Sequence, residues 1–481
     1  MTGYMKAVAA IDLGATSGRV ILGSVGDGEL RLRTVARFPN TPVRLPDGLH
    51  WDVLALYSAA MNGLGTASRE EPELVGAAVD AWAVDYALLL GNRMIGNPYH
   101  YRDGRTAIGV RAVHTEIGPE ELFRRNGLQH LPFNTVFQLA ASAASGALEF
   151  ADGLLLIPDL IGWWATGAQV AERTNASTTG LVPAGGDTWD TELLSRLGLR
   201  FDLLPPIVEP GTVLGPVSPM MREEFGIRHE FPFTTVGSHD TASAVVGVPS
   251  TGDDAAYISC GTWSLVGTEL SSPVLTEEAR RAGFTNEGGV DGRIRFLKNV
   301  MGLWLLSESI RSWAKAGEQP DLEHLLRQAA DVPADVPVFD TNDPRLLPPG
   351  DMPGRIATLL AEQGVRAPAT PAELVRSVLQ SLANAYAEAV RDIERLTGRA
   401  IRTLHLVGGG AQNELLCRLT AEACGIPVVA GPVEATAIGN LLVQARTHGI
   451  VRGDLEALRR VVASSFPLRS YPAHARSGGK D

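Results

Sequence analysis

Short apolar runs alternate with helix-like segments along most of the chain. Apolar residues on either side of the small polar stretch 12–18 predict a β-hairpin over residues 7–22. Asp80 and Asp85 interrupt a further strand region, 75–90. Other strands are predicted at 233–236 and 403–407, and helices around 163–164, from 241 and over 413–424. This alternation predicts an α/β fold.

The opening pattern returns in the middle of the chain. Residues 256–260 predict a strand, Gly261 and Thr262 a turn, and residues 263–268 a second strand. Two such hairpins suggest two similar domains, each opening with a β-hairpin. The alternative is a coincidence between two glycine turns, which are common in proteins.

The second half of the chain contains the most clearly marked helix. Thr370 and Glu373 form a capping box, and Pro371 occupies the first helical position. Gly398 is a suitable stop. Between them an apolar stripe recurs at helical spacing: Leu374, Val378, Leu382, Ala385, Ala389, Ile393 and Leu396.

Length and charge narrow the class of protein. The chain has 481 residues, enough for two or three domains, and 45% of them are apolar. Asp and Glu (54) outnumber Lys and Arg (42), which gives a net charge of −12 with no basic block. We therefore expect no nucleic-acid partner. We also expect no membrane partner, because no run reaches the roughly 18 uncharged apolar residues of a membrane span.

The cysteines bear on the compartment. Three of them, Cys260, Cys417 and Cys424, exclude a disulfide framework. Cys417 and Cys424 lie two helical turns apart and could meet, but free thiols are favoured. The N-terminus does not read as a secretory signal, so we expect a cytoplasmic protein.

The turn at residues 12–19 is a candidate anion site. Backbone amides beside Gly14 and Gly18, with the hydroxyls of Thr16 and Ser17, can form an anion cradle. Asp12, at the strand end, is placed to hold a divalent cation through water. Taken alone, the loop favours the alternative, an ordinary hairpin turn.

Lysine usage restricts the kind of nucleotide site. No Gly-x-x-x-x-Gly-Lys-[Ser/Thr] sequence occurs, which excludes a P-loop, and the protein-kinase motifs are absent. A nucleotide site would depend on backbone amides, hydroxyls, a metal ion and Arg19. Gly408–Gly410 would let a flat ligand approach the backbone, or else only makes a tight strand-to-helix connection. The lysines are Lys6, Lys298, Lys315 and Lys480.

Three polar residues have both a structural and a functional interpretation. Asp240 stands at a predicted helix N-terminus, where it is either an N-cap or a general base for phosphoryl transfer. The neighbouring His239 is more often a structural hydrogen-bonding group than a catalyst. Asp85, inside an apolar strand, either binds sugar hydroxyls or pairs with Arg102 or Arg105. Asn299 either caps the helix that follows it or contacts a ligand.

Together these segments resemble the FGGY carbohydrate kinases, from Ile11 to about Ala445. Residues 11–20 resemble the family's first phosphate loop. Residues 101–106, 174–179, 408–413 and 430–435 resemble further family segments. Residues 38–43 with 51–52, and 284–299, resemble the subgroup that acts on L-rhamnulose.

The resemblance implies two ribonuclease-H-like domains of the actin and sugar-kinase type, with an interdomain cleft. The expected bounds are 1–247 for the N-terminal domain with the sugar and phosphate loops, 248–470 for the nucleotide-binding C-terminal domain, and 471–481 for a tail. It also implies transfer of the ATP γ-phosphoryl group to the 1-hydroxyl of L-rhamnulose, with Mg²⁺. The sequence leaves a monomer or a small homo-oligomer open.

The resemblance also implies roles for single residues. Asp240 would be the base, and Asp12 would hold the metal. The sugar would contact Ala83, Asp85, His239, Thr241 and Asn299. ATP would contact Ala15, Thr16, Ser17, Gly18, Arg19, Thr262, Ser307 and Gly409. Two positions depart from the family: Ala83 stands where relatives usually have Gly, and Ser307 where some have Gln.

Two other functions remain open on the sequence. One is kinase action on another ketose, such as L-fuculose or D-xylulose, or on a linear dihydroxy signal molecule. The other is an ATP-driven conformational protein of the actin or chaperone kind. The polar residues suited to a sugar argue against the second, as does the absence of a peptide-binding domain.

Overall fold

The computed structural model describes residues 5–26, 28–250 and 252–473. Most of the predicted tail, residues 474–481, lies outside this part of the chain. Two compact units are present. The first comprises Met1–Thr251, Glu269–Phe296 and Glu434–Phe466, and the second comprises Gly252–Thr268, Leu297–Val433 and Pro467–Asp481.

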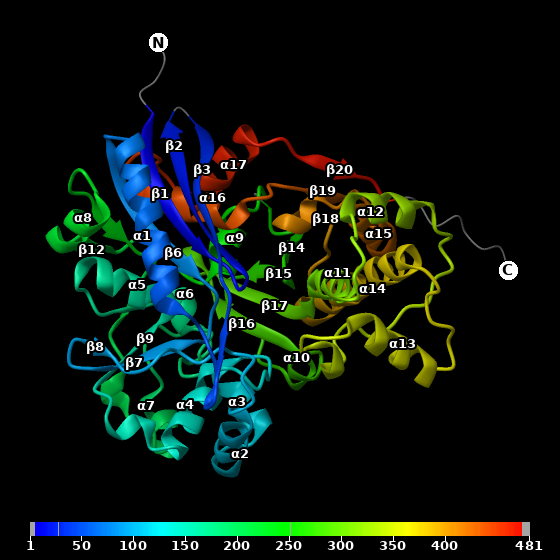
Figure 1. Ribbon diagram of the computed structural model, residues 1–481, viewed down its shortest axis with the longest axis horizontal. Coiled ribbons are helices and arrows are strands. Elements are labelled where there is room, and N and C mark those ends of the chain that lie inside the picture. Colours follow the sequence, from blue (N-terminus) through cyan, green and yellow to red (C-terminus); the bar gives the residue numbers. More distant parts are fainter. Residues whose placement is uncertain (1–4, 27, 251, 474–481) are drawn as a thin grey trace. The chain divides into compact units, whose positions relative to one another are not determined.

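The first unit is built on a six-stranded sheet (Figure 1). Its strand order is β12 (Val213–Pro216), β13 (Pro232–Thr234), β6 (Leu74–Ala81), β1 (Lys6–Leu13), β2 (Ser17–Gly26) and β3 (Glu29–Pro39). β1 and β2 form the predicted antiparallel hairpin, with Ile11 opposite Val20. β6 runs parallel to β1, so the carboxyl ends of both strands meet at one edge of the sheet.

Helices cover both faces of this sheet, because alternate residues of β1 point to opposite sides. Ala9 and Ile11 pack with α1 (Val53–Glu70) and α5 (Ile157–Thr166). Val8 and Ala10 pack with α16 (Ala435–Thr447) and α17 (Leu455–Ser465). The apolar run of β1 is therefore buried on both sides, as is typical of sheets with helices on both faces.

The rest of the first unit consists of shorter elements. A three-stranded sheet contains β8 (Arg93–Met94), β7 (Tyr86–Leu90) and β9 (Gly153–Leu156). β4 (Val43–Leu45) pairs with β5 (Gly48–His50), and β10 (Ala171–Glu172) with β11 (Ile207–Val208). The helices are α2 (Thr106–Glu116), α3 (Pro119–Asn126), α4 (Thr135–Ala144), α6 (Arg173–Ala176), α7 (Thr191–Arg196), α8 (Pro219–Phe225), α9 (Asp240–Val246) and α10 (Glu277–Arg281).

The second unit contains the second predicted hairpin. β14 (Ala255–Cys260) pairs antiparallel with β15 (Trp263–Leu270) and parallel with β18 (Thr403–Val407). The sheet continues with β19 (Val428–Ala430) and β20 (Arg469–Tyr471) beyond β18, and with β17 (Ile294–Met301) beyond β15. The edge strand β16 (Phe284–Gly288) and the residues of β17 up to Phe296 are part of the first unit. The helices are α11 (Trp304–Lys315), α12 (Leu322–Asp331), α13 (Met352–Glu362), α14 (Pro371–Thr397) and α15 (Glu414–Cys424).

The clearest sequence signals are confirmed. In α14 the N-cap Thr370 accepts a hydrogen bond from the Glu373 amide (3.1 Å), and Glu373 accepts one from the amide of Ala369 (2.7 Å). Gly398 ends the helix in the left-handed conformation. The three cysteines are free thiols, as expected. Asp80, in contrast, does not interrupt its strand, because β6 runs through it to Ala81.

Candidate active site

Asp240 is the first residue of α9, and it follows directly on the end of the loop after β13. The N-cap position is held by His239, so the N-cap interpretation of Asp240 is wrong. Its side chain keeps 30% of its surface exposed, whereas that of His239 keeps 9%. Thr241 Oγ1 donates a hydrogen bond to Asp240 Oδ1 (3.2 Å). The carboxylate is thus positioned by a neighbour and remains open to a ligand.

A buried glutamate holds the loop that carries Asp240. Glu172, at the N-cap of α6, accepts hydrogen bonds from the amide (3.0 Å) and hydroxyl (2.7 Å) of Ser238. It also accepts one from the amide of Thr174 (2.9 Å). Burial raises the pKa of Glu172, and these hydrogen bonds oppose the rise. Because Thr174 lies in a segment that resembles the family, that resemblance was the only sequence signal for this anchor.

Three carboxyl groups of the first unit interact at the ends of β1, β6 and the loop before α9. Asp12 and Asp80 are register partners on neighbouring strands. Burial raises the pKa of Asp12 to about 6, with Asp240 and Glu434 adding to the rise and Arg19 opposing it. Burial, with Asp12 and Asp240 contributing, raises the pKa of Asp80 well above its usual value. Burial also raises the pKa of Asp240.

Asp80 was not predicted as a site residue, although its charge in an apolar strand was a signal. Asn440 of α16 donates to Asp80 Oδ2 (2.7 Å), whereas Oδ1 is buried without a hydrogen-bond partner. A buried oxygen without a partner costs free energy unless a cation or water reaches it. Within the described ranges no three His, Cys, Asp or Glu side chains are arranged to hold a metal ion by themselves.

The predicted phosphate-contacting Arg19 is paired with two carboxylates. Its Nε donates to Asp12 Oδ2 (2.9 Å), and its Nη1 bonds Glu434, which directly precedes α16. The pKa of Arg19 is raised: burial lowers it, but the two carboxylates outweigh burial. Arg19 therefore fixes Asp12 in place, in addition to any contact with phosphate.

The turn between β1 and β2, the predicted anion cradle, is braced by Asn40. The side-chain Nδ2 of Asn40 donates to the carbonyl of Gly14 (2.8 Å), and the backbone amide of Asn40 donates to the carbonyl of Thr16 (3.0 Å). The turn is therefore held by a residue outside it. Thr16 is exposed, and Ala15 and Ser17 are half-buried. At Gly18 a Cβ would lie 2.2 Å from the Phe38 ring, so packing requires glycine there.

Asp85 anchors an aromatic cluster. Its Oδ2 accepts hydrogen bonds from Trp51 Nε1 (2.6 Å), Trp82 Nε1 (3.0 Å) and the amide of Tyr101 (3.1 Å). Its Oδ1 accepts one from Gln138 Nε2 (2.7 Å). These four donors replace the predicted alternative, a salt bridge to Arg102 or Arg105. Burial raises the pKa of Asp85 to about 6, and the four donors oppose the rise.

Strained backbone lies between Asp85 and β6. Val84 has a positive φ of 69°, which is rare for a β-branched residue. Thr135 Oγ1 donates to the Val84 carbonyl (2.7 Å) and stabilises this conformation. The half-buried Ala83 precedes it, two residues after Ala81, which pairs with His239. Such strain is found at functional sites, and here it lies beside the candidate base.

Glu287 and Arg295, which sequence reasoning missed, contact His239. Arg295 Nη2 lies 3.0 Å from His239 Nδ1 and 3.1 Å from Glu287 Oε2. Burial alone would raise the pKa of Glu287, but the charge of Arg295 and the neighbouring His239 lower it, Arg295 contributing most. The only sequence signal was the resemblance of residues 284–299 to one subgroup of the family.

The predicted nucleotide residues of the second unit lie on separate elements. Thr262 lies in the β14–β15 turn, and its carbonyl accepts the amide of Trp304 (3.2 Å). Ser307 lies on α11. Gly409 follows β18 and has no heavy atom within 4 Å of where a Cβ would be, so a ligand can approach its backbone there. Asn299 lies inside β17, and α11 begins only at Trp304, so its interpretation as a helix cap is wrong.

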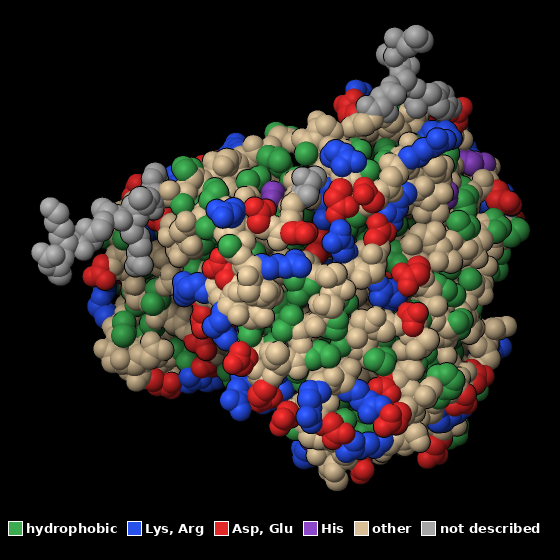
Figure 2. All heavy atoms as spheres, turned by 180° about the vertical axis from the view of Figure 1, so that it is seen from behind, with side chains coloured by type: hydrophobic (Ala, Val, Ile, Leu, Met, Phe, Trp, Pro, Cys, Tyr) green, Lys and Arg blue, Asp and Glu red, His purple; other side chains and the backbone are tan. Residues whose placement is uncertain are grey.

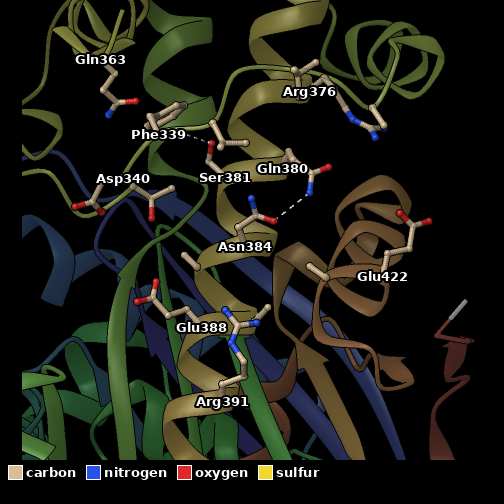
Figure 3. Close-up of a pocket in the computed structure, with 17 residues that line it drawn as sticks. Phe339, Asp340, Gln363, Arg376, Gln380, Ser381, Asn384, Glu388, Arg391 and Glu422 are labelled. Atoms are coloured by element: carbon tan, nitrogen blue, oxygen red, sulfur yellow. Dashed lines mark hydrogen bonds between the residues drawn. The ribbon is translucent and has the colours of Figure 1, made fainter. Parts of the chain in front are cut away.

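A large hollow of the second unit lies elsewhere. It has a volume of about 1310 Å³ and extends along the exposed side of α14 (Figure 3). Gln380, Asn384 and Glu388 line its floor, while Asp340 and Glu422 stand on opposite sides. None of the predicted site residues lines it. Size alone therefore does not identify the functional site.

The surface agrees with the charge argument. On the face shown in Figure 2, acidic and basic side chains are interspersed, with no extended basic patch. Within residues 5–26, 28–250 and 252–473, no helix has the length and apolar character needed to cross a bilayer.

Comparison with known proteins shows the family. The model of the FGGY family of carbohydrate kinases, N-terminal domain, matches residues 7–247, and that of the C-terminal domain matches residues 256–448. Rhamnulokinase of Pectobacterium atrosepticum is 42% identical, over 98% of this chain and 94% of the relative. Rhamnulokinase of Bacteroides thetaiotaomicron is 38% identical, over 96% and 95%. The chain therefore belongs to the FGGY family of carbohydrate kinases.

Solved structures agree on the fold. Gluconate kinase from Lactobacillus acidophilus superimposes with a TM-score of 0.79 at 16% identity, over 98% of this chain and 94% of that one. Ligand-bound xylulose kinase from the same organism gives 0.78 at 16% identity, with the same coverage. The predicted two-domain α/β fold of the sugar kinases is confirmed, and the protein is a sugar kinase that uses ATP.

Proposed function

We propose that the protein transfers the γ-phosphoryl group of ATP to the 1-hydroxyl of L-rhamnulose, giving L-rhamnulose 1-phosphate and ADP. The observation that carries this proposal is the identity of 38% to 42% with rhamnulokinases over nearly the whole chain. The xylulose kinases from Lactobacillus acidophilus and Rhodospirillum rubrum, whose structures superimpose on this chain, are 16% and 18% identical to it. We propose further that this reaction takes place in the cytoplasm, as the free cysteines suggest.

Asp240 would take the proton of the 1-hydroxyl as that oxygen attacks phosphorus. A partly exposed carboxylate at the start of α9 suits this step, because a sugar hydroxyl can approach it. Its pKa, raised by burial, makes the carboxylate a better proton acceptor than an ordinary aspartate. His239 and Thr241, its two neighbours, would orient the sugar.

The hydroxyls and amides of the β1–β2 turn would bind phosphate oxygens, with Thr262 and Gly409 of the second unit contributing to the nucleotide. Mg²⁺ fits the donor chemistry of the acidic cluster, since Asp12 and Asp80 are hard oxygen ligands and Asp80 Oδ1 has no hydrogen-bond partner. Asp12 would hold the ion, directly or through water. When bound, Mg²⁺ neutralises charge on the transferred group.

The test is ATP turnover with a panel of ketoses. We expect kcat/KM for L-rhamnulose to exceed that for L-fuculose and D-xylulose by at least tenfold, which corresponds to about 1.4 kcal/mol of transition-state discrimination. An equal or higher value for either competitor would move the substrate assignment to that ketose. ATP hydrolysis that is rapid without sugar and unaffected by it would instead revive the conformational-ATPase function.

A further inference from the structure

The buried side chains of Glu287 and Arg295 lie next to His239. Neither has a part in the mechanism described above. We propose that Arg295, held by Glu287, is a positioning residue that fixes the tautomer of His239. The ring then carries its proton on Nε2 and presents it, beside Asp240, as a hydrogen-bond donor to a sugar oxygen. Only the identity of the sugar rests on the proposed function; the tautomer does not.

The direction of one hydrogen bond carries the proposal. A guanidinium group has donors and no acceptor. Arg295 Nη2 lies 3.0 Å from His239 Nδ1, so Nδ1 must accept this bond with its lone pair. A neutral imidazole that accepts at Nδ1 has its proton on Nε2. His239 Nε2 lies 3.4 Å from Oδ1 of Asp240, the candidate base.

The guanidinium of Arg295 is held on more than one side. Its Nε donates to the carbonyl of Gly288 (2.9 Å), and Glu287 Oε2 lies 3.1 Å from Nη2. Arg295 is 0% exposed and Glu287 is 6% exposed. The two residues lie on β16 and β17, neighbouring strands joined by a short turn. The donor therefore has a fixed direction, as a residue that selects a tautomer requires.

Glu287 also defines what happens without Arg295. Its Oε2 lies 3.4 Å from His239 Nδ1. Without the guanidinium, Nδ1 would face only a carboxylate, an acceptor, and the ring would favour a proton on Nδ1. If the ring is neutral, the Nε2 lone pair then faces Asp240, and no donor remains for a sugar oxygen.

A purely structural role explains the arrangement less well. A buried ion pair is often replaced by apolar side chains with little loss of stability. Arg295 Nη1 is buried without a hydrogen-bond partner, which is itself unfavourable. An apolar residue could therefore replace this arginine with little loss of stability. It could not select the tautomer, because that requires a donor.

The first test needs no variant at the arginine. The protein is labelled with ¹⁵N-histidine, and the two ring nitrogens of His239 are distinguished by their couplings to ring protons, without ligand, at pH 7.5. His239→Asn identifies the signal by its loss. We expect the Nε2–H tautomer. A proton on Nδ1, or on both nitrogens, would overturn the proposal.

The second test compares Arg295→Met, Arg295→Lys and a matched control, Arg459→Met. Arg459 is also a buried arginine of the first unit, 6% exposed, and it bonds Glu269 and the Val245 carbonyl, away from His239. We expect Arg295→Met to shift the ring proton to Nδ1 and to lower kcat/KM for the sugar roughly 10- to 100-fold, the range for leaving a buried hydrogen-bonding group without its partner. KM for ATP should change less than about twofold, because the lost donor serves the sugar.

Arg295→Lys keeps a donor and a charge, so it should retain the Nε2–H signal and recover part of the activity. The control should leave both the signal and KM for the sugar unchanged. Retention of Nε2–H in Arg295→Met, or the same shift in Arg459→Met, would overturn the proposal. If Arg295→Met does not fold, the wild-type spectrum decides. A protein that phosphorylates a different ketose refutes only the substrate assignment, because the tautomer is measured without sugar.

Discussion

At the scale of single residues, exposure separates Asp240 from its acidic neighbours. Asp12 and Asp80 are buried at 3% and 0% exposure, and one is paired with Arg19 while the other bonds Asn440. The side chain of Asp240 keeps 30% of its surface. Burial raises the pKa of all three, and Asp240 adds to the rise at Asp12 and Asp80. Exposure therefore favours Asp240 over its two neighbours for the proposed role of base.

We predict that Asp240→Asn lowers kcat by roughly two to four orders of magnitude, the range for losing a general base. Asparagine keeps the size and most of the polarity of the side chain, so folding and ATP binding should be nearly intact. The measurements are single-turnover kinetics and equilibrium binding of an ATP analogue. Asp12→Asn is a comparison within the same cluster. It should instead weaken Mg²⁺ binding and so raise the Mg²⁺ concentration needed for half-maximal activity. A turnover of Asp240→Asn near that of the wild type would end the assignment.

The raised pKa of Asp240 predicts an acid limb in the pH profile. The base acts only as a carboxylate, so kcat/KM should fall as pH falls through this pKa. Because burial raises the pKa, the midpoint of the fall should lie above the ordinary aspartate value of about 3.9. The residual rate of Asp240→Asn should lack the limb. A wild-type profile whose acid limb has its midpoint at or below the ordinary aspartate value would contradict the assignment.

Sequence predicted the base but not the residues that orient it, for a physical reason. Asp240 is marked by its own local context, a polar residue between a strand and a helix. Glu172 and Arg295 act on the same loop from positions 66 and 56 residues away in the chain. Contacts at that separation depend on how strands pair, which no local pattern records. Asp85 was recognised as unusual, but its partners are two tryptophans and an amide rather than arginines.

At the scale of elements, the two hairpins β1–β2 and β14–β15 recur with different turns. The first turn is braced by Asn40 and leaves Thr16 exposed. The second is closed by the amide of Gly261 bonding the Trp263 carbonyl (2.8 Å). Each turn carries a threonine that is at least partly exposed, Thr16 or Thr262, and no lysine. This is the arrangement that a phosphate site without a P-loop requires.

We predict that the threonine matters more for ATP than the nearby lysine. Thr16→Val keeps the shape and removes one donor, so kcat/KM for ATP should fall. The loss of transition-state stabilisation calculated from this fall should be a few kcal/mol at most. Lys298→Met, on β17, should change it less than about threefold. Both variants should keep the melting temperature of the wild type, since each side chain is at least partly exposed. A crippling lysine variant with a harmless threonine variant would refute the hairpin phosphate site.

Local sequence predicted elements well where caps and periodicity coincide. α14 begins and ends where Thr370 and Gly398 indicated, because both signals act within one turn of the helix. Asn299 was misjudged because an Asn ahead of an apolar helix reads as a cap. Pairing within the sheet carries β17 on to Met301. Tertiary hydrogen bonding therefore overrides a local preference here.

At the scale of the whole molecule, the two units are not continuous in sequence. Residues 434–466 return to the first unit, where Gln444 of α16 donates to the carbonyl of Ala9 on β1 (2.9 Å). The sequence prediction included neither α16 nor the sheet that it covers. The domain bounds at 247 and 470, which were predicted as single cuts along the sequence, therefore remain a prediction. The compact units are defined by packing and combine segments that are far apart in the sequence.

The proposed sugar and nucleotide contacts lie at different residues, so each ligand should protect a different set of amides from hydrogen exchange. A nucleotide with Mg²⁺ should slow exchange in both hairpin turns, residues 14–18 and 261–263, and in 408–413, because backbone amides there would bind it. L-rhamnulose alone should slow exchange over 81–86 and 237–243, where Asp240 and its neighbours lie, and around Asn299, but in neither hairpin turn. Binding of this kind stabilises only the segments that it orders.

The hollow along α14 supplies the internal control for this experiment. Peptides covering residues 376–391 line it and contain none of the proposed contacts, so their exchange should not change with either ligand. Protection by nucleotide that is confined to 376–391, with the two hairpin turns unaffected, would move the nucleotide site into that hollow and refute the assignment of Thr16, Thr262 and Gly409. Protection of both turns by nucleotide but not by sugar would support it, because the sugar has no phosphate oxygens to accept hydrogen bonds from the hydroxyls and amides of the turns.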